Sequence, residues 1–499
     1  MMVAVQTSPR QLSNLLHGLV SRPLAVDCEI SGLAIDSRRV RPGDCFLAYS
    51  GTHEDGIRYI KDAEAAGAAA VLVEQADVLP RLSIPVLGIP QLRQRVALIA
   101  SRFYEEPARG MHLIAITGTN GKTTTAHLCA QAQRALFGRS GYFGTLGYGP
   151  LDALEQGPNT TPDPVTFQRV LAALAADDCA HVALEASSHA LSQGRLDELP
   201  IGVAVFTGLG HDHLDYHGTA EAYGAAKQRL FRHPGLSAAV INLDDAYAGT
   251  IRQAVSPEAR IYTFSLRPDG PRADVQARQV TCDRHGISMQ IGTWQGELSL
   301  QSPLLGEFNA QNLLAALTAL MASGVSGADA AHALSQAVPV RGRMELLGGR
   351  KGQPLVCVDY AHSPDSLERV LQALRLPGLK RLICVFGCGG DRDTSKRGPM
   401  GAIAERLADE VLVTSDNPRS EDPAAIGAQI LAGMLHPERA QWISDRALAI
   451  RTAIALAGPD DLVLLAGKGH ESTQTTAQVV ISLDDAALAR QILGEIARD

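Results

Sequence analysis

The sequence predicts an α/β protein built from three domains. Its 499 residues exceed what a single hydrophobic core usually organises, and ordinary domain sizes give about three domains. Short apolar runs alternate with helical patterns, which favours mostly parallel sheets covered by helices. Abundant glycine (47 residues) and sparse aromatic side chains (4%) suit helices that pack closely on sheets. We therefore expect domains at residues 1–110, 111–343 and 344–499.

The first domain is predicted to be a smaller α/β unit. Its apolar runs at residues 71–73 and 86–89 have the length of short buried strands. A helix follows, and its apolar face is formed by Leu92, Val96, Ile99 and Phe103. The polar segment 105–110 is predicted to be the linker to the central domain.

The central domain opens on a predicted strand at residues 113–117, followed by a helix at 124–136. Further strand-like runs lie at residues 181–184, 203–207 and 238–241. The longest stretch without charge, residues 308–328, contains Asn309 and Asn312. It is therefore predicted to be a buried helix and its exit, and not a membrane span.

The third domain alternates most regularly between strands and helices. Strands are predicted at residues 355–358, 382–386, 411–414 and 462–466. Helices are predicted near residues 367–374, 400–408 and 424–434. This order predicts a Rossmann-like, doubly wound sheet, and such sheets bind ligands beyond the carboxyl ends of their strands.

Charge and cysteine content restrict the class of function. The net charge of −8 argues against a protein that binds nucleic acid through a basic face. The N-terminus lacks the basic end and apolar core of a secretion signal. The eight cysteines form no C-x-x-C pair, which indicates free thiols in a reducing compartment. We expect a cytoplasmic protein, a monomer, with no nucleic-acid partner and no membrane insertion.

A glycine-rich loop follows the first predicted strand of the central domain. It comprises Gly118, Thr119, Asn120, Gly121, Lys122, Thr123 and Thr124. Such a loop at a helix N-terminus directs backbone amides at phosphate oxygens. Lys122 would reach the terminal phosphates, and the Thr123 hydroxyl would bind Mg²⁺. Ile116 stands where the general pattern has its first glycine, and the alternative is a simple turn with a solvated lysine. The context of strand, loop and helix favours a site for a nucleoside triphosphate.

Two further segments suggest metal binding. Glu185 ends a predicted strand, where a carboxylate suits Mg²⁺ beside nucleotide phosphates, although such a residue alone is more often part of a loop. The histidine-rich run at residues 211–217 nearly copies a dinuclear zinc hydrolase motif. One extra residue between Asp215 and His217 breaks the required spacing, so the zinc interpretation is disfavoured.

The displaced glycine in G-T-N-G-K-T-T resembles the phosphate loop of the Mur ligase family and of its folylpolyglutamate synthetase relatives. The D-H-L-D-Y-H-G stretch also resembles this family, which implies that His213 binds a second Mg²⁺. The resemblance further implies that Lys227 is carbamylated and becomes a metal ligand. It departs at Gly208, where the family usually has asparagine. The implied catalytic residues are Lys122, Glu185, His213 and Lys227, and the implied Mg²⁺ ligands are Thr123, Glu185, His213 and Lys227.

The same resemblance implies contacts with ATP beyond the loop. Asn309 and Asn312 resemble the N-x-x-N helix on the adenine side. Arg343 belongs to a segment that resembles the family hinge, with Arg341 in place of proline. Asp359 begins the D-Y-A-H segment near the ribose and γ-phosphate.

Several motifs resemble the family's pocket for a uridine-linked sugar peptide. The loop at residues 159–162 looks like the N-T-T-P loop, and two short segments near residues 36 and 52 look like the uridine-diphosphate pocket. The implied contacts are Ile35, Ser37, Thr52, His53, Asn159, Thr160, Thr161, Ser187, Gln193 and Arg195.

The third domain resembles the family members that add the third peptide residue. The segment at residues 387–392 is not a dinucleotide fingerprint, because Arg392 occupies the last glycine position. It resembles G-C-G-G-D-R-D and occurs together with D-N-P-R and G-K-G-H-E segments. The implied contacts for meso-diaminopimelate are Arg392, Asp416, Asn417, Pro418, Arg419, Gly467 and Glu471.

The resemblance covers more than 400 residues and implies an ATP- and Mg²⁺-dependent ligase of peptidoglycan synthesis. ATP would phosphorylate the side-chain carboxylate of D-glutamate in UDP-N-acetylmuramoyl-L-alanyl-D-glutamate. The amine of meso-diaminopimelate would then attack, and phosphate would leave. Three alternatives remain open at this point: the same reaction with L-lysine, a folylpolyglutamate-synthetase-like ligase, and a regulatory P-loop switch protein.

Overall fold

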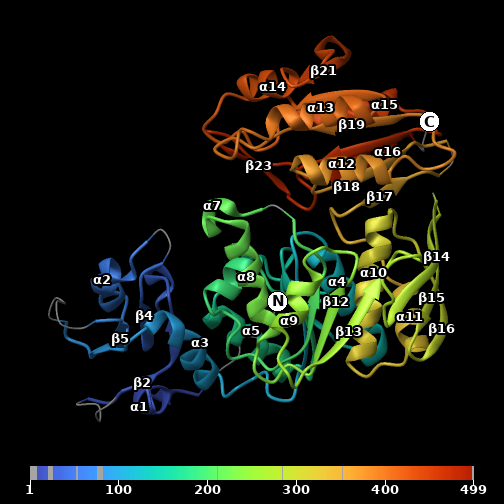
Figure 1. Cartoon of the computed structure of the whole chain (residues 1–499). Helices are drawn as coiled ribbons and strands as arrows, with labels where there is room; N and C mark the ends of the chain where they lie inside the picture. The colour runs from blue at the N-terminus through green and yellow to red at the C-terminus, as the bar shows by residue number, and fades with distance from the viewer. Residues whose placement is uncertain are drawn as a thin grey trace. The chain divides into compact units, whose positions relative to one another are not determined.

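The computed structural model describes residues 8–20, 26–51, 54–75, 82–210, 212–283, 285–350 and 352–496. The chain forms two compact units (Figure 1). The first contains residues 1–276, 293–295 and 313–333, and the second contains residues 277–292, 296–312 and 334–499. Both are built from sheets covered by helices, so the predicted α/β class is confirmed.

The N-terminal part of the first unit contains a parallel sheet in the order β3-β4-β5-β6. Its strands are β3 (Gly32–Ala34), β4 (Asp44–Ala48), β5 (Ala70–Val73) and β6 (Val86–Gly88), and its helices are α1 (Leu12–Leu15), α2 (Ile60–Ala65) and α3 (Leu92–Phe103). Alternate residues of β4 face opposite sides: Cys45 and Leu47 pack towards α3, and Phe46 and Ala48 towards α2. Smaller elements are β1 (Arg10–Gln11), β2 (Glu29–Ile30) and the 3₁₀ helices η1 (Ser37–Arg39) and η2 (Gly56–Tyr59).

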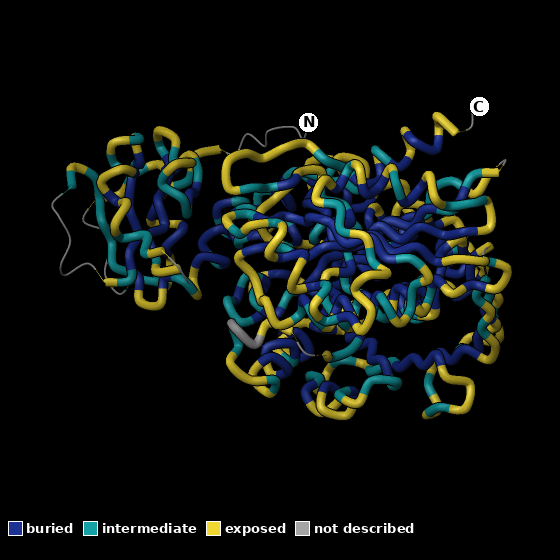
Figure 2. The backbone as a smooth tube through the Cα atoms, turned by 90° about the horizontal axis from the view of Figure 1, so that it is seen from above, coloured by how far each residue is buried: buried dark blue, intermediate teal, exposed yellow. Residues whose placement is uncertain are grey.

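A ten-stranded sheet follows in the order β16-β15-β14-β13-β12-β11-β7-β10-β8-β9. Its strands are β7 (His112–Thr117), β8 (Gly141–Gly144), β9 (Gly147–Pro150), β10 (His181–Glu185), β11 (Ile201–Phe206), β12 (Ala238–Asn242), β13 (Arg260–Ser265), β14 (Val275–Asp283), β15 (Gly286–Thr293) and β16 (Gly296–Ser302). β7 pairs in parallel with both β10 and β11, and only short loops separate these strands from the functional motifs. The strands β7, β10, β11 and β12 are almost fully buried. Exposed segments of the chain lie mostly at its periphery (Figure 2).

The helices of this region are α4 (Lys122–Phe137), α5 (Pro164–Ala176), α6 (Ser188–Ser192), α7 (Leu214–His217), α8 (Ala220–Phe231), α9 (Ala248–Ala254), α10 (Glu307–Ala322) and α11 (Gly327–Ser335). Leucine and alanine fill α10 with buried side chains such as Leu313 and Leu317. The predicted buried helix over this stretch is therefore confirmed. No helix in the described ranges is both long and apolar enough to cross a membrane.

The C-terminal region forms a six-stranded sheet in the order β17-β18-β22-β19-β20-β21. Its strands are β17 (Glu345–Gly348), β18 (Leu355–Asp359), β19 (Leu382–Phe386), β20 (Glu410–Thr414), β21 (Ala440–Ile443) and β22 (Leu462–Ala466). The five strands from β18 to β21 are parallel, and β17 pairs antiparallel with β18. The predicted doubly wound sheet is confirmed.

Helices cover both faces of the C-terminal sheet (Figure 1). One face packs against α12 (Pro364–Ala373), α13 (Arg397–Leu407) and α14 (Pro423–Leu431), and the other against α15 (Arg446–Leu456) and α16 (Asp485–Ile496). A 3₁₀ helix, η3 (Pro437–Arg439), and a hairpin of β23 (Thr473–Thr475) and β24 (Val480–Ser482) complete the region. All eight cysteines are free thiols, as predicted.

Candidate functional site

The phosphate loop follows β7 directly. A side chain at Gly118 would collide with Thr207, whose Oγ1 lies 1.9 Å from the ideal Cβ position. Gly121 has a φ of 81° and caps α4 in the left-handed region, where glycine is favoured. Lys122 Nζ donates to the carbonyl oxygens of Gly118 and Thr119 at 2.9 and 2.8 Å. The loop and its lysine therefore lie at the N-terminus of α4, an arrangement suited to phosphate.

Backbone contacts with the end of β11 hold the loop in place. The Thr119 amide donates to Gly208 O at 2.8 Å, and Thr207 Oγ1 donates to Asn120 O at 2.6 Å. Thr124 is buried in the first turn of α4. Gly208 thus serves this loop through its carbonyl group, which does not depend on the side chain that the family pattern has there.

Glu185 lies at the end of β10 with 1% of its surface exposed. Its Oε2 accepts from Thr123 Oγ1 at 2.9 Å, and its Oε1 accepts from Tyr142 OH at 2.7 Å and the Thr145 amide at 2.8 Å. The structure therefore brings together Thr123 and Glu185, two of the predicted Mg²⁺ ligands. Tyr142 and Thr145, which orient the carboxylate, were not predicted. Tyr142 lies within β8 and Thr145 directly follows this strand, a segment that carries no motif.

Lys227 is a buried lysine on α8, with 1% of its surface exposed. Its Nζ donates to Gly118 O at 2.8 Å and lies 4.3 Å from the centre of the Tyr223 ring. Burial, together with the nearby charge of Lys122, lowers the pKa of Lys227 well below its usual value, although Asp212 opposes the shift. Lys122 and Lys227 therefore converge on a single carbonyl oxygen. Lys227 is therefore not a solvent-exposed lysine of a helix surface.

His213 lies on the exposed turn before α7, and its backbone φ of 54° is in the left-handed region. Its ring centre is 4.8 Å from that of His189 and 6.2 Å from that of Tyr223. The Tyr223 ring also contacts Lys227 Nζ. Tyr223 therefore lies between His213 and Lys227, two of the candidate metal ligands. A non-glycine residue with positive φ indicates a conformation that the surrounding structure imposes.

The residues predicted for the uridine-linked substrate divide into two groups. Arg195 donates to Thr161 O at 2.6 Å and to Gln193 Oε1 at 2.6 Å, and Thr161 Oγ1 lies 3.2 Å from Ser187 Oγ. Thr161 Oγ1 also donates to the backbone oxygen of Glu185 at 2.6 Å, which places this group beside the candidate metal site.

The remaining predicted contacts are less connected. Thr160 Oγ1 lies 3.3 Å from Thr145 Oγ1, and Asn159 O accepts a hydrogen bond from Tyr148. Ile35 and Ser37 are half-buried residues near η1 in the N-terminal sheet region. Thr52 and His53 lie outside the described residues.

The candidate ATP contacts in the second unit include two asparagines and an aspartate. Asn312 Nδ2 donates to Asn309 Oδ1 at 3.1 Å on α10. Asp359 accepts from the amides of Ala361 and Met344, each at 2.8 Å, and burial raises its pKa. Arg343 lies 4.6 Å from the centre of the Tyr360 ring, so its guanidinium stacks on the residue after Asp359.

The predicted amino-acid loops follow β20 and β22. Asn417 Nδ2 donates to Glu471 Oε2 at 2.8 Å, and Asn417 Oδ1 accepts from the Thr475 amide at 2.9 Å. Lys468 is fully buried, and its Nζ also approaches Glu471 Oε2, at 3.4 Å. Asp416 lies beside Gly467, where an added Cβ would come within 2.7 Å of Asp416 Oδ2. The structure therefore brings Asp416, Asn417, Gly467 and Glu471 together.

Arg419 stands at the edge of this cluster. Its Nη1 donates to Gly390 O at 2.6 Å, and its backbone φ is 50°. The neighbouring Glu421 pairs with the buried Arg397 at 2.9 Å, and in the part of the chain that the structure describes Arg419 makes no ion pair. Pro418 precedes it, and Arg392 is exposed in the loop after β19. Arg397 was not predicted, because a basic residue in a helical pattern usually indicates a solvated face.

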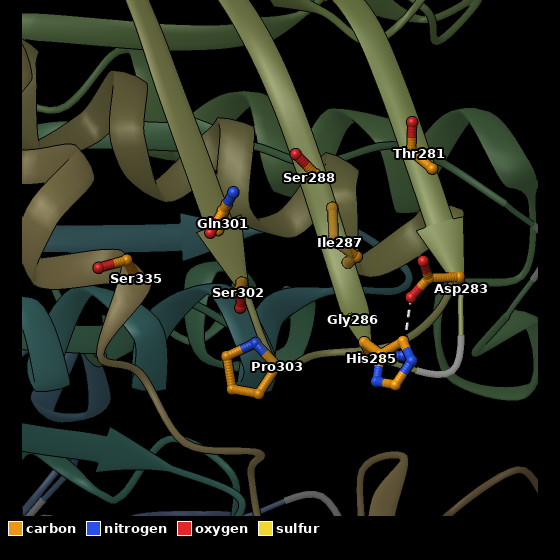
Figure 3. Close-up of a pocket in the computed structure, with 10 residues that line it drawn as sticks. All are labelled: Thr281, Asp283, His285, Gly286, Ile287, Ser288, Gln301, Ser302, Pro303 and Ser335. Atoms are coloured by element: carbon orange, nitrogen blue, oxygen red, sulfur yellow. Dashed lines mark hydrogen bonds between the residues drawn. The ribbon is translucent and has the colours of Figure 1, made fainter.

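Two cavities lie apart from these clusters. One, of about 390 Å³, is lined mainly by polar residues at the ends of β14, β15 and β16, including Thr281, Ser288 and Gln301 (Figure 3). The other, of about 380 Å³, lies between α3 and α5 and includes Arg102, Gln168 and His233. Their lining residues include none of the predicted site residues.

Three family models match most of the chain: the Mur ligase family catalytic domain at residues 29–104, the Mur ligase middle domain at 116–320 and the Mur ligase glutamate ligase domain at 342–469. The chain belongs to the Mur ligase family. This Mur ligase is 47% identical to a UDP-N-acetylmuramoyl-L-alanyl-D-glutamate–2,6-diaminopimelate ligase of Xanthomonas campestris pv. campestris, over 97% of both chains.

A relative of the same name from Pseudomonas aeruginosa is 50% identical over 90% of this chain and 92% of its own. A solved structure of a UDP-N-acetylmuramoyl-L-alanyl-D-glutamate–2,6-diaminopimelate ligase has a TM-score of 0.70 and 35% identity. It covers 98% of this chain and 100% of its own. The Mur ligase thus shares both sequence and fold with proteins of that name over at least 92% of their length.

Proposed function

We propose that this Mur ligase adds meso-diaminopimelate to the D-glutamate side-chain carboxylate of UDP-N-acetylmuramoyl-L-alanyl-D-glutamate, with hydrolysis of ATP to ADP and phosphate. The relatives that carry this activity in their names match at 47–50% identity over at least 90% of the chain. The observation that carries the choice of amino acid is the cluster of Asn417 and Glu471 beside Arg419. The reaction belongs to peptidoglycan synthesis.

Phosphoryl transfer is proposed to take place at the phosphate loop. A substrate carboxylate oxygen attacks the γ-phosphorus, and ADP leaves, which produces an acyl phosphate. Lys122 holds the charge of the phosphates, and the amides at the N-terminus of α4 orient them. We further propose that Asn309, Asn312, Arg343 and Asp359 hold the nucleoside of ATP.

Mg²⁺ fits the donor set around Glu185. The Thr123 hydroxyl and the Glu185 carboxylate are hard oxygen donors, and they already lie 2.9 Å apart in a buried position. When bound, Mg²⁺ would neutralise phosphate oxygens and help orient them. His213 and a carbamylated Lys227 are proposed as ligands of a second ion.

The buried environment of Lys227 supports its carbamylation. Only an amine without its proton attacks CO₂, and the lowered pKa of Lys227 supplies that form. The nitrogen bonds to the carbon of CO₂ and loses one proton, so a group that would repel Mg²⁺ becomes an anion. The modification would also remove the repulsion between Lys227 and Lys122 beside Gly118.

The second half-reaction forms the peptide bond. The neutral amine of the amino acid attacks the acyl carbon, and phosphate leaves with the electrons of the broken C–O bond. We propose that two groups of residues hold the sugar-peptide substrate. The first is Thr161, Ser187, Gln193 and Arg195, and the second is Ile35, Ser37, Thr52, His53, Asn159 and Thr160. The hydrogen bond from Thr161 to the Glu185 backbone supports placing the substrate carboxylate near the phosphates.

The amino acid is proposed to bind between the loops after β20 and β22. Diaminopimelate differs from L-lysine by a distal carboxylate, and the planar guanidinium of Arg419 can hold a carboxylate through two hydrogen bonds. Glu471 Oε2 contacts Asn417 Nδ2 and Lys468 Nζ. The other carboxylate oxygen of Glu471, Oε1, is proposed to accept a hydrogen bond from the distal ammonium group of diaminopimelate. Arg392, Asp416, Pro418 and Gly467 complete the proposed pocket.

A phosphate-release assay tests the function. It combines the purified chain with ATP, Mg²⁺, the uridine-linked dipeptide and either meso-diaminopimelate, L-lysine or no amino acid. We expect turnover that needs both the dipeptide and meso-diaminopimelate. Preference for L-lysine would support the lysine-adding ligase. In a further reaction a folate replaces the dipeptide, and turnover there would support the folylpolyglutamate-synthetase-like ligase. Phosphate release that needs neither acceptor would support the regulatory switch.

The domain boundaries at residues 110 and 343 are also proposed, and the ranges of the three family models support them. A cytoplasmic location is proposed because the reaction consumes ATP and all eight cysteines are free. The monomeric state stays a prediction.

A further inference from the structure

A fully buried arginine–aspartate pair lies beneath the two amino-acid loops. Arg446 is the first residue of α15 and Asp485 the first of α16, and both side chains are 0% exposed. Arg446 Nη2 donates to Asp485 Oδ2 at 2.6 Å, and Nε donates to Oδ1 at 3.0 Å. The carboxylate therefore holds the guanidinium through two hydrogen bonds in a fixed plane.

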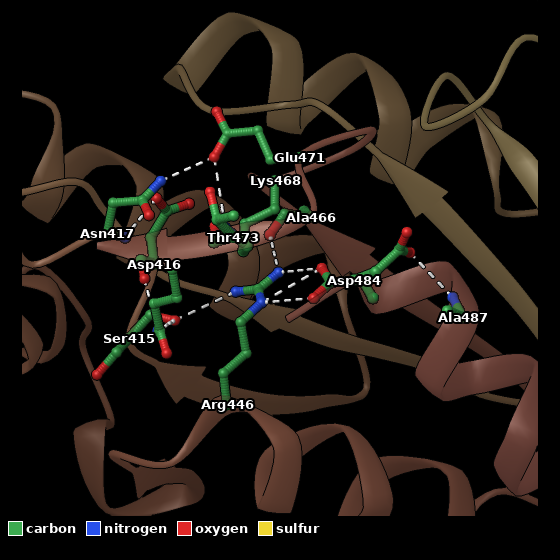
Figure 4. Close-up of polar contacts among 12 residues, drawn as sticks. Ser415, Asp416, Asn417, Arg446, Ala466, Lys468, Glu471, Thr473, Asp484 and Ala487 are labelled. Carbon is green, nitrogen blue, oxygen red and sulfur yellow. Dashed lines mark hydrogen bonds and ion pairs between the residues drawn. The ribbon is translucent and has the colours of Figure 1, made fainter. Parts of the chain in front are cut away.

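The other edge of this guanidinium is directed at the backbone of the loops (Figure 4). Nη2 donates to Ala466 O at 3.0 Å, and Nη1 donates to Ser415 O at 3.4 Å. Ser415 directly precedes Asp416, and Ala466 directly precedes Gly467. The Arg446 side chain thus contacts the residue that immediately precedes each of the two loops.

The sheet alone does not set the distance between these loops. β20 and β22 are not neighbours, because β19 lies between them in the strand order. No ladder hydrogen bond can therefore join Ser415 to Ala466. Arg446 supplies that connection through one rigid group, and Gln474 supports it by donating to Asp416 O at 2.6 Å.

The electrostatics of the pair extend to the proposed pocket. Burial acts to lower the pKa of Arg446, but attraction to Asp485 outweighs it, with contributions from Asp416 and Glu471, so the pKa is raised. The arginine remains charged in a fully buried position. Its positive charge attracts the carboxylates of Asp416 and Glu471 as well as that of Asp485.

We infer that Arg446, held by Asp485, is the positioning residue that sets the spacing of loops 416–419 and 467–471 for the amino-acid substrate. The inference rests on the proposed function, since it assigns the role to the same pocket. A misplacement of about 1 Å between substrate-binding groups can reduce activity by about 10²-fold. The consequence should appear in the affinity for the amino acid and leave the affinities for ATP and the uridine-linked dipeptide unchanged.

The test replaces the pair by apolar residues of similar size, Arg446→Met with Asp485→Leu, so that no unpaired charge stays buried. The matched control is Arg381→Met with Asp461→Leu. Arg381 also holds Asp461 through two hydrogen bonds, at 3.1 and 2.6 Å, but it lies before β19 and β22, at the opposite ends of the strands. For each protein, KM is measured for meso-diaminopimelate, the dipeptide and ATP, together with the thermal unfolding midpoint.

We expect the Arg446 double variant to raise KM for meso-diaminopimelate about tenfold to a hundredfold. The Arg381 double variant should leave the KM for meso-diaminopimelate unchanged, even if its thermal unfolding midpoint falls as much as that of the Arg446 double variant. An unchanged KM in the Arg446 double variant, or an equal rise in the control, would overturn the positioning role. If the double variant does not fold, the single variant Arg446→Lys tests the role instead. Lysine keeps the positive charge but cannot make the paired hydrogen bonds of the planar guanidinium. It should raise the same KM, and an unchanged value would overturn the role.

Wild-type turnover separates this test from the proposed function. If the wild-type protein shows no turnover with meso-diaminopimelate, the proposed function fails. If it turns over normally and the variants keep its KM, only the role of Arg446 fails.

Discussion

The phosphate loop and the amino-acid loops both follow parallel strands, but the charged side chains around them are arranged differently. At the phosphate loop, Lys122 and Lys227 converge on Gly118 O, and burial together with the charge of Lys122 lowers the pKa of Lys227. At the amino-acid loops, the buried cations each face a carboxylate: Arg446 with Asp485, Arg397 with Glu421, and Lys468 with Glu471.

This difference indicates two strategies of binding. The like charges of Lys122 and Lys227 repel each other at the phosphate loop, and a bound phosphate would relieve this repulsion. Paired charges at the amino-acid loops gain little from each other, because desolvation offsets their attraction, but they fix geometry. Changes in the first region should therefore affect turnover with any amino acid, and changes in the second should affect the choice of amino acid.

The largest expected effect is that of Lys122→Ala. Removal of the ammonium group at the N-terminus of α4 should reduce phosphate release by roughly 10³-fold, because phosphoryl transfer depends on such charges. The loss should be the same with either amino acid in a steady-state assay. Lys380→Ala, which removes an exposed lysine paired with Asp460, is the control and should keep full activity. Turnover near the wild-type level in folded Lys122→Ala protein would refute the role of the lysine.

The next effect concerns Lys227. Lys227→Ala should lose about 10²-fold in kcat, because it removes the proposed anionic metal ligand. Short carboxylic acids added to the assay should restore part of the activity by filling the space with a carboxylate. Lys227→Met, which leaves no such space, should show no rescue. Equal rescue of both variants, or of neither, would count against the carbamate.

A smaller effect is expected for the residues that orient Glu185. Tyr142→Phe removes one hydrogen bond to a buried carboxylate, which should cost about 1–3 kcal/mol and lower kcat about tenfold or more. Tyr262→Phe, on β13, where the ring packs against that of Trp294, serves as the control and should leave kcat unchanged. If both variants behave alike in activity assays at saturating Mg²⁺, Tyr142 has no specific role.

The smallest effect is on stability and tests the rigidity of the phosphate-loop helix. Burial, with a contribution from Arg134, lowers the pKa of His127 on α4 to about 4, against an ordinary value of 6.5. The unfolded chain therefore takes up a proton at higher pH than the folded one, and stability falls as pH drops from about 6.5 towards 4. Between pH 7 and 5 this residue should account for about 2 kcal/mol of lost unfolding free energy.

His127→Gln should remove that part of the loss, and urea unfolding at the two pH values measures it. His436→Gln, which replaces an exposed histidine, is measured alongside as the control. A variant at position 127 with the full wild-type loss would show that the imidazole is accessible to protons in the folded state.

The sequence predicted best the strands that are continuous apolar runs, whereas the fully buried strands β4 and β8 were not predicted. The limits predicted for β19 and β22 match the structure, because continuous apolar runs bounded by polar residues leave little choice. The helix of the phosphate loop begins at Lys122, two residues earlier than predicted, because Gly121 takes the left-handed conformation and caps it. β14 and the hairpin of β23 and β24 were not predicted, since their many exposed residues hide the strand pattern.

Motifs located the candidate site along the chain but not the residues that support it. A sequence shows Glu185 at a strand end, yet Tyr142 and Thr145 reach it from a different strand, more than 35 residues away. Lys227 and Arg446 are both buried, although charged residues in helical patterns normally face solvent. Such supporting contacts form only when distant segments of the chain come together in the fold. The spacing of residues along the sequence therefore cannot predict them.

The central claim, that the amino-acid loops select the substrate and the phosphate loop drives the chemistry, is tested most directly at Arg419. The measurement is the ratio of kcat/KM for meso-diaminopimelate to that for L-lysine, in the wild-type protein and in Arg419→Ala. We predict that the wild type prefers meso-diaminopimelate and that the variant loses about 2–5 kcal/mol of this preference, a factor of tens to thousands. A wild type that prefers L-lysine, or a variant that keeps the wild-type ratio, would contradict the claim.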